Sequence, residues 1–198
     1  MKGQRILFLL VGLGFGMLHL GAQESLVYRQ TFDTNKVYWP IDDNFRIVDG
    51  KYVLYQENQE LYAYLDLPSK DGSFQLDTNF ISGKDTAGYG LLFRLQDPYN
   101  FYFFFIVGQG YYLAGKAVDR QGTNFCPWTS TDIINKQAEN SLKVTYQDQN
   151  LTYLINGREV FSYQDSSFSA GGIGLYTQGG LRVGFDNLHV WERTASAE

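Results

Sequence analysis

The sequence predicts an all-β protein, a two-sheet antiparallel β-sandwich, and three observations support this. Short runs of aromatic and β-branched residues recur along the chain, as antiparallel strands require. Turn-forming residues separate the runs, and no amphipathic helix of convincing length is present. The pattern is clearest in residues 88–118, where Asp97-Pro98 and Gly108-Gln109-Gly110 divide three strand-like runs.

The expected strands follow one another at short intervals from residue 27 to residue 191. Asp49-Gly50 and Asn156-Gly157 are dipeptides of tight hairpin turns. We expect one short helical turn around residues 132–139. Strands at this spacing imply two stacked sheets or a barrel. The expected strands are residues 27–32, 45–48, 51–56, 61–65, 74–81, 89–96, 101–107, 111–118, 141–147, 151–155, 158–163, 172–176 and 181–191.

The first 22 residues have the pattern of a secretory signal peptide. Lys2 and Arg5 precede an apolar run over residues 6–20, and Gly21 and Ala22 follow. The apolar run is shorter than the roughly 20 residues of a membrane-spanning helix, so a retained anchor is the less favoured alternative. We therefore expect a signal peptide at 1–22, a single β-sandwich domain at 23–193 and a frayed tail at 194–198, with no membrane insertion of the mature chain.

Composition narrows the range of partners and compartments. The chain has 198 residues and a net charge of −5, without a basic run, which argues against nucleic acid or anionic lipid as a partner. Cys126 is the only cysteine, so no disulfide forms within the chain. We expect Cys126 to be a small buried residue in a secreted, periplasmic or cell-envelope protein of a bacterium.

Short motifs spread over nearly the whole mature chain resemble those of a known family. They are Phe32-Asp33 with Trp39, Asp49-Gly50-Lys51-Tyr52, Gly90-Leu91-Leu92-Phe93-Arg94, Asp97-Pro98 with Asn100-Phe101-Tyr102, Gly110-Tyr111-Tyr112 with Lys116, Leu154-Ile155-Asn156-Gly157, Gly172-Ile173-Gly174-Leu175 and Phe185-Asp186-Asn187. They resemble bacterial concanavalin A-like, laminin G-like jelly-roll domains, which are grouped with family 16-like glycosidase and 3-keto-disaccharide hydrolase modules. The resemblance implies two curved sheets whose concave face, in many relatives, binds glycans.

The residues give little support to catalysis. His189, the only histidine after the signal, alternates with Leu188 and Val190, so we expect it to face solvent. A serine-histidine triad would therefore have one possible base in an unpromising place, and too few histidines and cysteines remain for a zinc site. Glycoside hydrolysis needs two carboxylates, and the Glu-x-Asp-x-x-Glu strand motif of catalytic glucanase relatives is absent. Glu57-Asn58-Gln59-Glu60 lies at an expected turn with the wrong spacing, and Glu159 is isolated after a hairpin. An aspartate pair from distant loops is left as an alternative.

Strand alternation gives a candidate ligand-binding face. Tyr89, Leu91, Phe93 and Leu95 are expected to face the core. The opposite set combines aromatic rings with polar groups suited to sugar hydroxyls or to an acidic sugar. The alternative is that a loop or the segment around Ile133-Ile134 covers this face as a second small core. The candidate ligand-binding residues are Arg94, Gln96, Tyr102, Phe104, Tyr112 and Lys116, with Trp128 closing one end.

A structural calcium is the one cofactor that the resemblance implies. Asp33 and Asp186 occupy the turns at which jelly-roll relatives hold this ion between the first and last strands. The alternative is that both aspartates simply form turns, and no Asp-x-Asp-x-Asp-Gly loop is present.

Three functions are therefore open. The favoured one is an exported non-catalytic module that binds carbohydrate or another cell-envelope ligand on its concave sheet. The second is a glycoside hydrolase of the 3-keto-disaccharide hydrolase type. The third is a structural or protein-binding envelope module.

Overall fold

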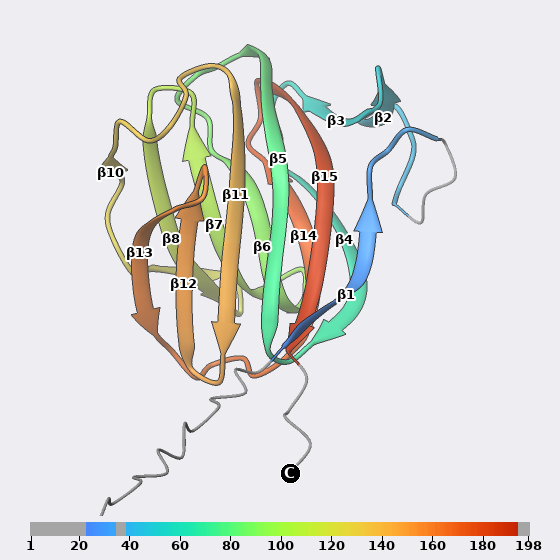
Figure 1. The fold of residues 1–198 in the computed structure, drawn as a ribbon. Helices are drawn as coiled ribbons and strands as arrows, with labels where there is room; N and C mark the ends of the chain where they lie inside the picture. The colour runs from blue at the N-terminus through green and yellow to red at the C-terminus, as the bar shows by residue number, and fades with distance from the viewer. Residues whose placement is uncertain (1–22, 35–38, 194–198) are drawn as a thin grey trace, which may run out of the picture.

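The computed structural model describes residues 23–34 and 39–193, which form two antiparallel sheets packed face to face (Figure 1). Sheet A has the order β13-β12-β11-β5-β15-β3-β2, with β1 paired to β15. Its strands are β1 (Glu24–Gln30), β2 (Phe45–Val48), β3 (Lys51–Gln56), β5 (Gly72–Gly83), β11 (Glu139–Gln147), β12 (Asn150–Ile155), β13 (Arg158–Gln164) and β15 (Leu181–Arg193).

Sheet B has the order β10-β8-β7-β6-β14-β4, with β9 paired to β8. Its strands are β4 (Leu61–Ser69), β6 (Tyr89–Asp97), β7 (Asn100–Val107), β8 (Tyr111–Val118), β9 (Gln121–Asn124), β10 (Thr129–Ser130) and β14 (Gly171–Thr177). Within the described residues, no helix is long and apolar enough to cross a membrane. The expected signal peptide at 1–22 and tail at 194–198 lie outside the described residues.

Every expected strand is present, and β2, β3 and β8 have the expected bounds. β9 and β10 were not predicted because they are short and polar, without apolar alternation. The expected helical turn at 132–139 is wrong. Non-helical turns occupy this segment, and the Asn140 side chain holds it by accepting from the Asn135 N–H and donating to the Asn135 carbonyl.

Two hairpin turns have the backbone conformation that their dipeptides predicted. Asp49 and Gly50 have φ angles of 50° and 71°, and Asn156 and Gly157 have φ angles of 51° and 75°. Two successive positive φ angles match the right-handed twist of the flanking strands. These turns fix the register of β2 with β3 and of β12 with β13.

The main core lies between the sheets. It takes alternate residues from the longer strands, such as Phe74 of β5, Phe185 of β15 and Phe93 of β6, all fully buried. Leu188 and Val190 of β15 also face this core, and His189 between them faces outward, as expected.

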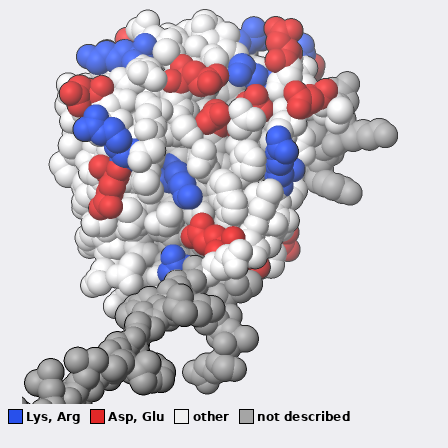
Figure 2. Space-filling view, in the orientation of Figure 1, with Lys and Arg blue, Asp and Glu red and all other residues white. Residues whose placement is uncertain are grey.

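The two outward surfaces of the sandwich differ in character. Figure 2 views the molecule from the side of sheet A and shows lysine, arginine and acidic side chains interspersed over it. The outer face of sheet B, which points away from sheet A, instead carries a second apolar cluster. This cluster consists of Leu92, Leu95, Phe101, Phe103, Leu113, Ala117 and Tyr176, with Tyr62 and Phe105 packed against it.

Candidate functional site

The aromatic part of the predicted ligand-binding set does not lie on an open face. Tyr102 and Phe104 are 0% exposed and Tyr112 is 6% exposed, and all three belong to the core between the sheets. The Tyr112 hydroxyl donates to the carbonyl of Val160 on β13, 2.9 Å away. The alternative that this face is covered and forms a core therefore holds for these three residues. Sheet A, more than a loop or the segment around Ile133-Ile134, covers them.

Arg94 is also buried, against the prediction that it lines a groove. It has a φ of 45° at a β-bulge, and its side chain is 1% exposed. The guanidinium donates to the carbonyls of Lys70, Asp148 and Phe168 at 2.7–3.0 Å and lies 3.3 Å from the Asp71 carboxylate. Burial lowers the pKa of Arg94, and Asp71 opposes this shift.

The bulge also reverses the direction of the residue that follows. Leu95, expected in the main core, belongs to the outer cluster of sheet B. The strict alternation predicted from Tyr89 therefore holds only as far as Phe93.

Lys116 is occupied by an internal polar network. Its Nζ lies 2.6 Å from the Asp165 carboxylate and 2.7 Å from the Ser167 hydroxyl, and the Tyr102 hydroxyl donates to the other Asp165 oxygen at 2.6 Å. Burial raises the pKa of Asp165, but the hydrogen bonds from Lys116, Tyr102 and Ser167 outweigh burial and lower this pKa to about 2. The network joins β8 to the segment after β13.

The last two predicted ligand residues, Gln96 and Trp128, do not form a groove with the others. Gln96 donates to the backbone carbonyls of Arg94 and Ala170. Trp128 is 44% exposed and lies beside Gly88, outside the pocket described below.

The aspartates predicted to hold calcium have protein partners. Asp33 accepts from the Thr31 hydroxyl, and the Asp186 carboxylate lies 3.9 Å from Lys51 Nζ. Burial raises the pKa of Asp186, with a further rise from Asp33 and Asp77. Among the residues that the structure describes, no three His, Cys, Asp or Glu side chains are grouped to hold a metal ion. Neither aspartate has a grouped third ligand in this part of the chain, and the calcium site stays a prediction.

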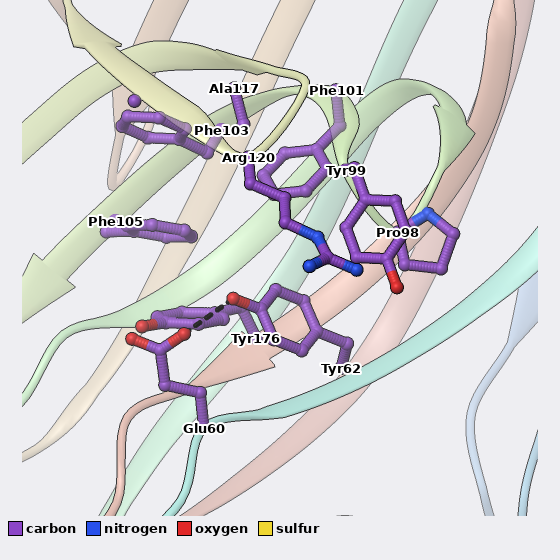
Figure 3. A pocket seen from close by; sticks show the side chains of 11 residues that line it. Glu60, Tyr62, Pro98, Tyr99, Phe101, Phe103, Phe105, Ala117, Arg120 and Tyr176 are labelled. Atoms are coloured by element: carbon purple, nitrogen blue, oxygen red, sulfur yellow. Dashed lines mark hydrogen bonds between the residues drawn. The ribbon is translucent and has the colours of Figure 1, made fainter.

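An open pocket of about 540 Å³ lies on the opposite face of the same strands (Figure 3). Strands β4, β7, β8, β9 and β14, the residue before β4 and the turns after β6 and β8 contribute to it. We call it the aromatic pocket, and its lining residues are Glu60, Tyr62, Pro98, Tyr99, Phe101, Phe103, Phe105, Ala117, Arg120, Gly122 and Tyr176.

Stacked rings build the wall of the aromatic pocket. Phe105 lies between Phe103 and Tyr176, with ring centroids 4.8 and 4.3 Å away and interplanar angles of 10° and 21°. Tyr62 contacts Tyr176 at 5.1 Å and Phe101 at 6.2 Å. Phe105 and Tyr62 keep part of their surface accessible. Because both faces of Phe105 are covered by its neighbours, the stacked rings form a continuous apolar platform that presents mainly ring edges to the pocket.

One end of the aromatic pocket is acidic. The Tyr62 hydroxyl donates to the Glu60 carboxylate at 2.6 Å, drawn as the dashed line in Figure 3. Burial raises the pKa values of Tyr62 and Tyr176, and Glu60 raises both further. Both hydroxyls therefore stay protonated at neutral pH. Glu60 is the only carboxylate among the described lining residues, so a facing carboxylate pair is absent from that lining.

The other end of the aromatic pocket is basic. Arg120 lies in the turn between β8 and β9, with its guanidinium carbon 3.9 Å from the centre of the Tyr99 ring. The pocket thus offers an apolar platform, a carboxylate that accepts hydrogen bonds and a guanidinium that donates them. This combination suits a sugar chain, which has apolar ring faces and hydroxyl edges.

Sequence reasoning identified the strands of this site but chose their wrong face. A signal for the correct face exists: the outward positions beside the large rings include Gly90, Gly115 and Ala117. A Cβ on Gly115 would lie 2.4 Å from the Phe103 ring. Small residues paired with large ones on one face leave room for a hollow, whereas the inward face is filled.

No protein-family model matches the sequence, and no curated protein matches it. Solved structures do match. Carbohydrate-binding module CBM66 from Bacillus subtilis is 17% identical, with a TM-score of 0.67 over 79% of this chain and 97% of that chain. The catalytic domain of an endo-1,3-beta-glucanase (laminarinase) from Thermotoga petrophila is 10% identical, with a TM-score of 0.65 over 88% of this chain and 100% of that chain.

The kappa-carrageenase from Pseudoalteromonas carrageenovora is also similar, at 6% identity and a TM-score of 0.61, over 92% of this chain and 100% of that chain. Identities this low establish the fold and not the activity. They confirm the expected fold class: the chain is a two-sheet, concanavalin A-like jelly-roll β-sandwich.

Proposed function

We propose that this protein is an exported, non-catalytic module that binds a carbohydrate of the cell envelope or its surroundings in the aromatic pocket. The observation that carries the proposal is the stacked platform of Phe103, Phe105 and Tyr176 beside hydrogen-bonding groups at both ends. The similarity to a carbohydrate-binding module and to two glycan-cleaving enzymes supports a carbohydrate as the ligand class.

The lining chemistry favours binding over hydrolysis. Strand β7 presents Phe101, Phe103 and Phe105 to the pocket by the same alternation through which a Glu-x-Asp-x-x-Glu strand presents carboxylates in catalytic relatives. Glu60 alone does not make the acid and base pair that glycoside hydrolysis uses.

Affinity electrophoresis in gels containing neutral polysaccharides, such as laminarin and barley β-glucan, tests the binding function. We expect at least one polysaccharide to retard the wild type. Phe105→Ala should weaken that retardation about ten-fold or more, because the middle ring of the stack and its accessible apolar surface, worth roughly 1.5–3 kcal/mol, are lost. Tyr55→Ala removes an exposed ring from sheet A and should behave as the wild type. Equal retardation of Phe105→Ala and the wild type would place binding elsewhere.

Hydrolysis is tested by incubating the protein with the same glucans and with 3-keto-glucosides and measuring new reducing ends. We expect no turnover above that of heat-inactivated protein. Turnover that is lost in Glu60→Gln would overturn the non-catalytic assignment and favour the hydrolase alternative.

Export is supported by the basic, apolar and small-residue order of the first 22 residues. Expression of the full chain in a bacterial host, followed by N-terminal sequencing of the envelope fraction, should yield a chain that begins at Gln23. Recovery of the uncleaved chain from the cytoplasm would contradict export.

A further inference from the structure

Hydrogen bonds to a neighbouring turn fix the backbone at Arg120. Asp119 and Arg120 have φ angles of 50° and 69°, so two non-glycine residues form the left-handed turn between β8 and β9. The Asp119 N–H donates to the Asn100 side chain at 3.0 Å, and the Arg120 N–H donates to the Tyr99 carbonyl at 3.3 Å. The turn is therefore fastened to the neighbouring turn between β6 and β7.

That neighbouring turn is itself rigidly built. The Asn100 amide donates to both oxygens of Asp97, at 3.0 and 2.9 Å, and the Tyr99 N–H donates to Asp97 at 2.7 Å. Tyr99 thus presents its ring face to the Arg120 guanidinium at a fixed position. The backbone at this end of the pocket is therefore ordered before a ligand binds.

The stacked guanidinium of Arg120 has no acidic partner in the described part of the chain. Among the described residues, no carboxylate lies within 4.0 Å of Arg120, and Glu60 across the pocket accepts from Tyr62 instead. Figure 3 shows the guanidinium directed into the pocket between Tyr99 and Tyr62. Stacking uses the face of the guanidinium and leaves its N–H edge free, and this planar fork matches a carboxylate or a sulfate group.

We propose that the aromatic pocket prefers glycans that carry an isolated anionic substituent, a carboxylate or a sulfate ester, and that Arg120 determines this preference. The inference rests on the glycan-binding function proposed above. Arg120 pairs with the anionic group of one sugar, while the neighbouring sugar packs against the accessible edges of Phe105 and Tyr176.

The negative charges of the protein favour a ligand whose anionic substituent has no second anionic group close to it. Glu60 lies in the same pocket and repels a second anionic group on the adjacent sugar. The whole chain has a net charge of −5, which also disfavours a dense polyanion. The preferred ligand therefore has one charged sugar flanked by neutral ones.

Biolayer interferometry against matched immobilised glycans tests the preference. The pairs are glucuronoxylan with its carboxyl-reduced form, and kappa-carrageenan with its desulfated form, so that the two sources of negative charge are separated. Pectin in three degrees of methyl esterification varies charge density on one backbone. Laminarin and barley β-glucan are included as neutral glycans that report the proposed function by itself.

For at least one backbone, we expect the wild type to bind the charged form about five-fold or more tightly than its neutral counterpart. Sparsely charged pectin should bind more tightly than fully charged pectin if galacturonan is the bound backbone. Arg120→Gln should reduce the charged-to-neutral ratio to about one, and Arg120→Lys should retain part of it. Arg182→Gln removes the matched arginine that lies over Tyr55 on sheet A and should keep the wild-type ratio.

Arg120→Gly separates folding from recognition, because glycine suits the left-handed turn. It should not lower the melting temperature and should also lose the preference. Binding of neutral glucans with no preference for any charged form, or a preference that survives Arg120→Gln, overturns the role of Arg120 and leaves the glycan-binding function standing. If the wild type binds none of the glycans in the set, both the glycan-binding function and the role of Arg120 are overturned.

Discussion

Arg94 is the largest side chain that the structure buries completely among the described residues. Three backbone carbonyls and the Asp71 carboxylate accept its hydrogen bonds, and they come from the turn after β4, the turn after β11 and the loop after β13. A single guanidinium fork thereby ties three connections to the bulge in β6. Its role is to position loops and not to contact a ligand.

Replacing Arg94 therefore tests a structural role. Arg94→Lys should lower the free energy of unfolding by about 3 kcal/mol, because one ammonium cannot reach all four acceptors and leaves buried carbonyls unpaired. Urea unfolding measures the loss, and Arg182→Lys at the surface is the control, expected to change stability by less than about 0.5 kcal/mol. A loss of glycan binding by folded Arg94→Lys with unchanged stability would contradict this role.

The hydrogen-bonded carboxylate of Asp165 makes stability depend on pH. Its pKa is lowered from 3.8 to about 2 in the folded protein. A carboxyl group whose folded pKa is lowered stabilises the protein above its unfolded pKa, and the contribution is lost as pH falls from about 4 through about 2.

Asp165→Asn should lose about 1–3 kcal/mol of unfolding free energy at pH 7, because the Tyr102 hydroxyl and Lys116 ammonium lose their shared acceptor. The difference from the wild type should narrow as pH falls below about 4. Urea unfolding at pH 7, 4 and 3 measures it, with exposed Asp132→Asn as the control. A difference that stays constant from pH 7 to pH 3 would show that Asp165 does not carry this dependence.

Individual residues were predictable where a single rule decides their environment. Alternation alone placed His189 outward, and size and polarity alone placed Cys126, which is 9% exposed, in the core. Arg94 was not predictable in this way. Its direction depends on a bulge at its own backbone, and composition gives no sign of a positive φ at an arginine.

At the scale of elements, strand existence followed from composition, but the inward face did not. β7 carries rings on both faces, so alternation separates Phe101, Phe103 and Phe105 from Tyr102 and Phe104 without saying which set meets sheet A. Which face of β7 packs against sheet A depends on how strands distant in the sequence pair and stack. A local sequence pattern does not contain this information. The site was therefore predicted on the correct strands and on the wrong side of them.

The hairpin between β12 and β13 gives a test of turn chemistry. Gly157 has a φ of +75°, whereas the φ of Gly122 is not positive. A Cβ at either position would meet no atom within 4 Å. Gly157→Ala should lower the free energy of unfolding by about 1 kcal/mol, because only the left-handed backbone opposes it. Gly122→Ala should leave stability unchanged or raise it by up to about 1 kcal/mol. Equal effects in thermal unfolding would contradict the assigned turn.

At the scale of the whole molecule, the sandwich separates its structural and binding chemistry between the two faces of sheet B. The inner face contributes Tyr102, Phe104 and Lys116 to packing and to the network around Asp165. The outer face gathers rings around an open pocket. Mutations on the inner face should therefore change stability, and mutations in the pocket should mainly change ligand binding.

Amide chemical-shift mapping by NMR, with the glycan that the wild type retains best, tests the location of the binding site most directly. We expect the largest shifts around Phe103, Phe105 and Tyr176 and in the turn that holds Arg120, and small shifts over sheet A. Shifts confined to sheet A, or centred on Trp128 with the pocket strands unchanged, would contradict glycan binding in the aromatic pocket.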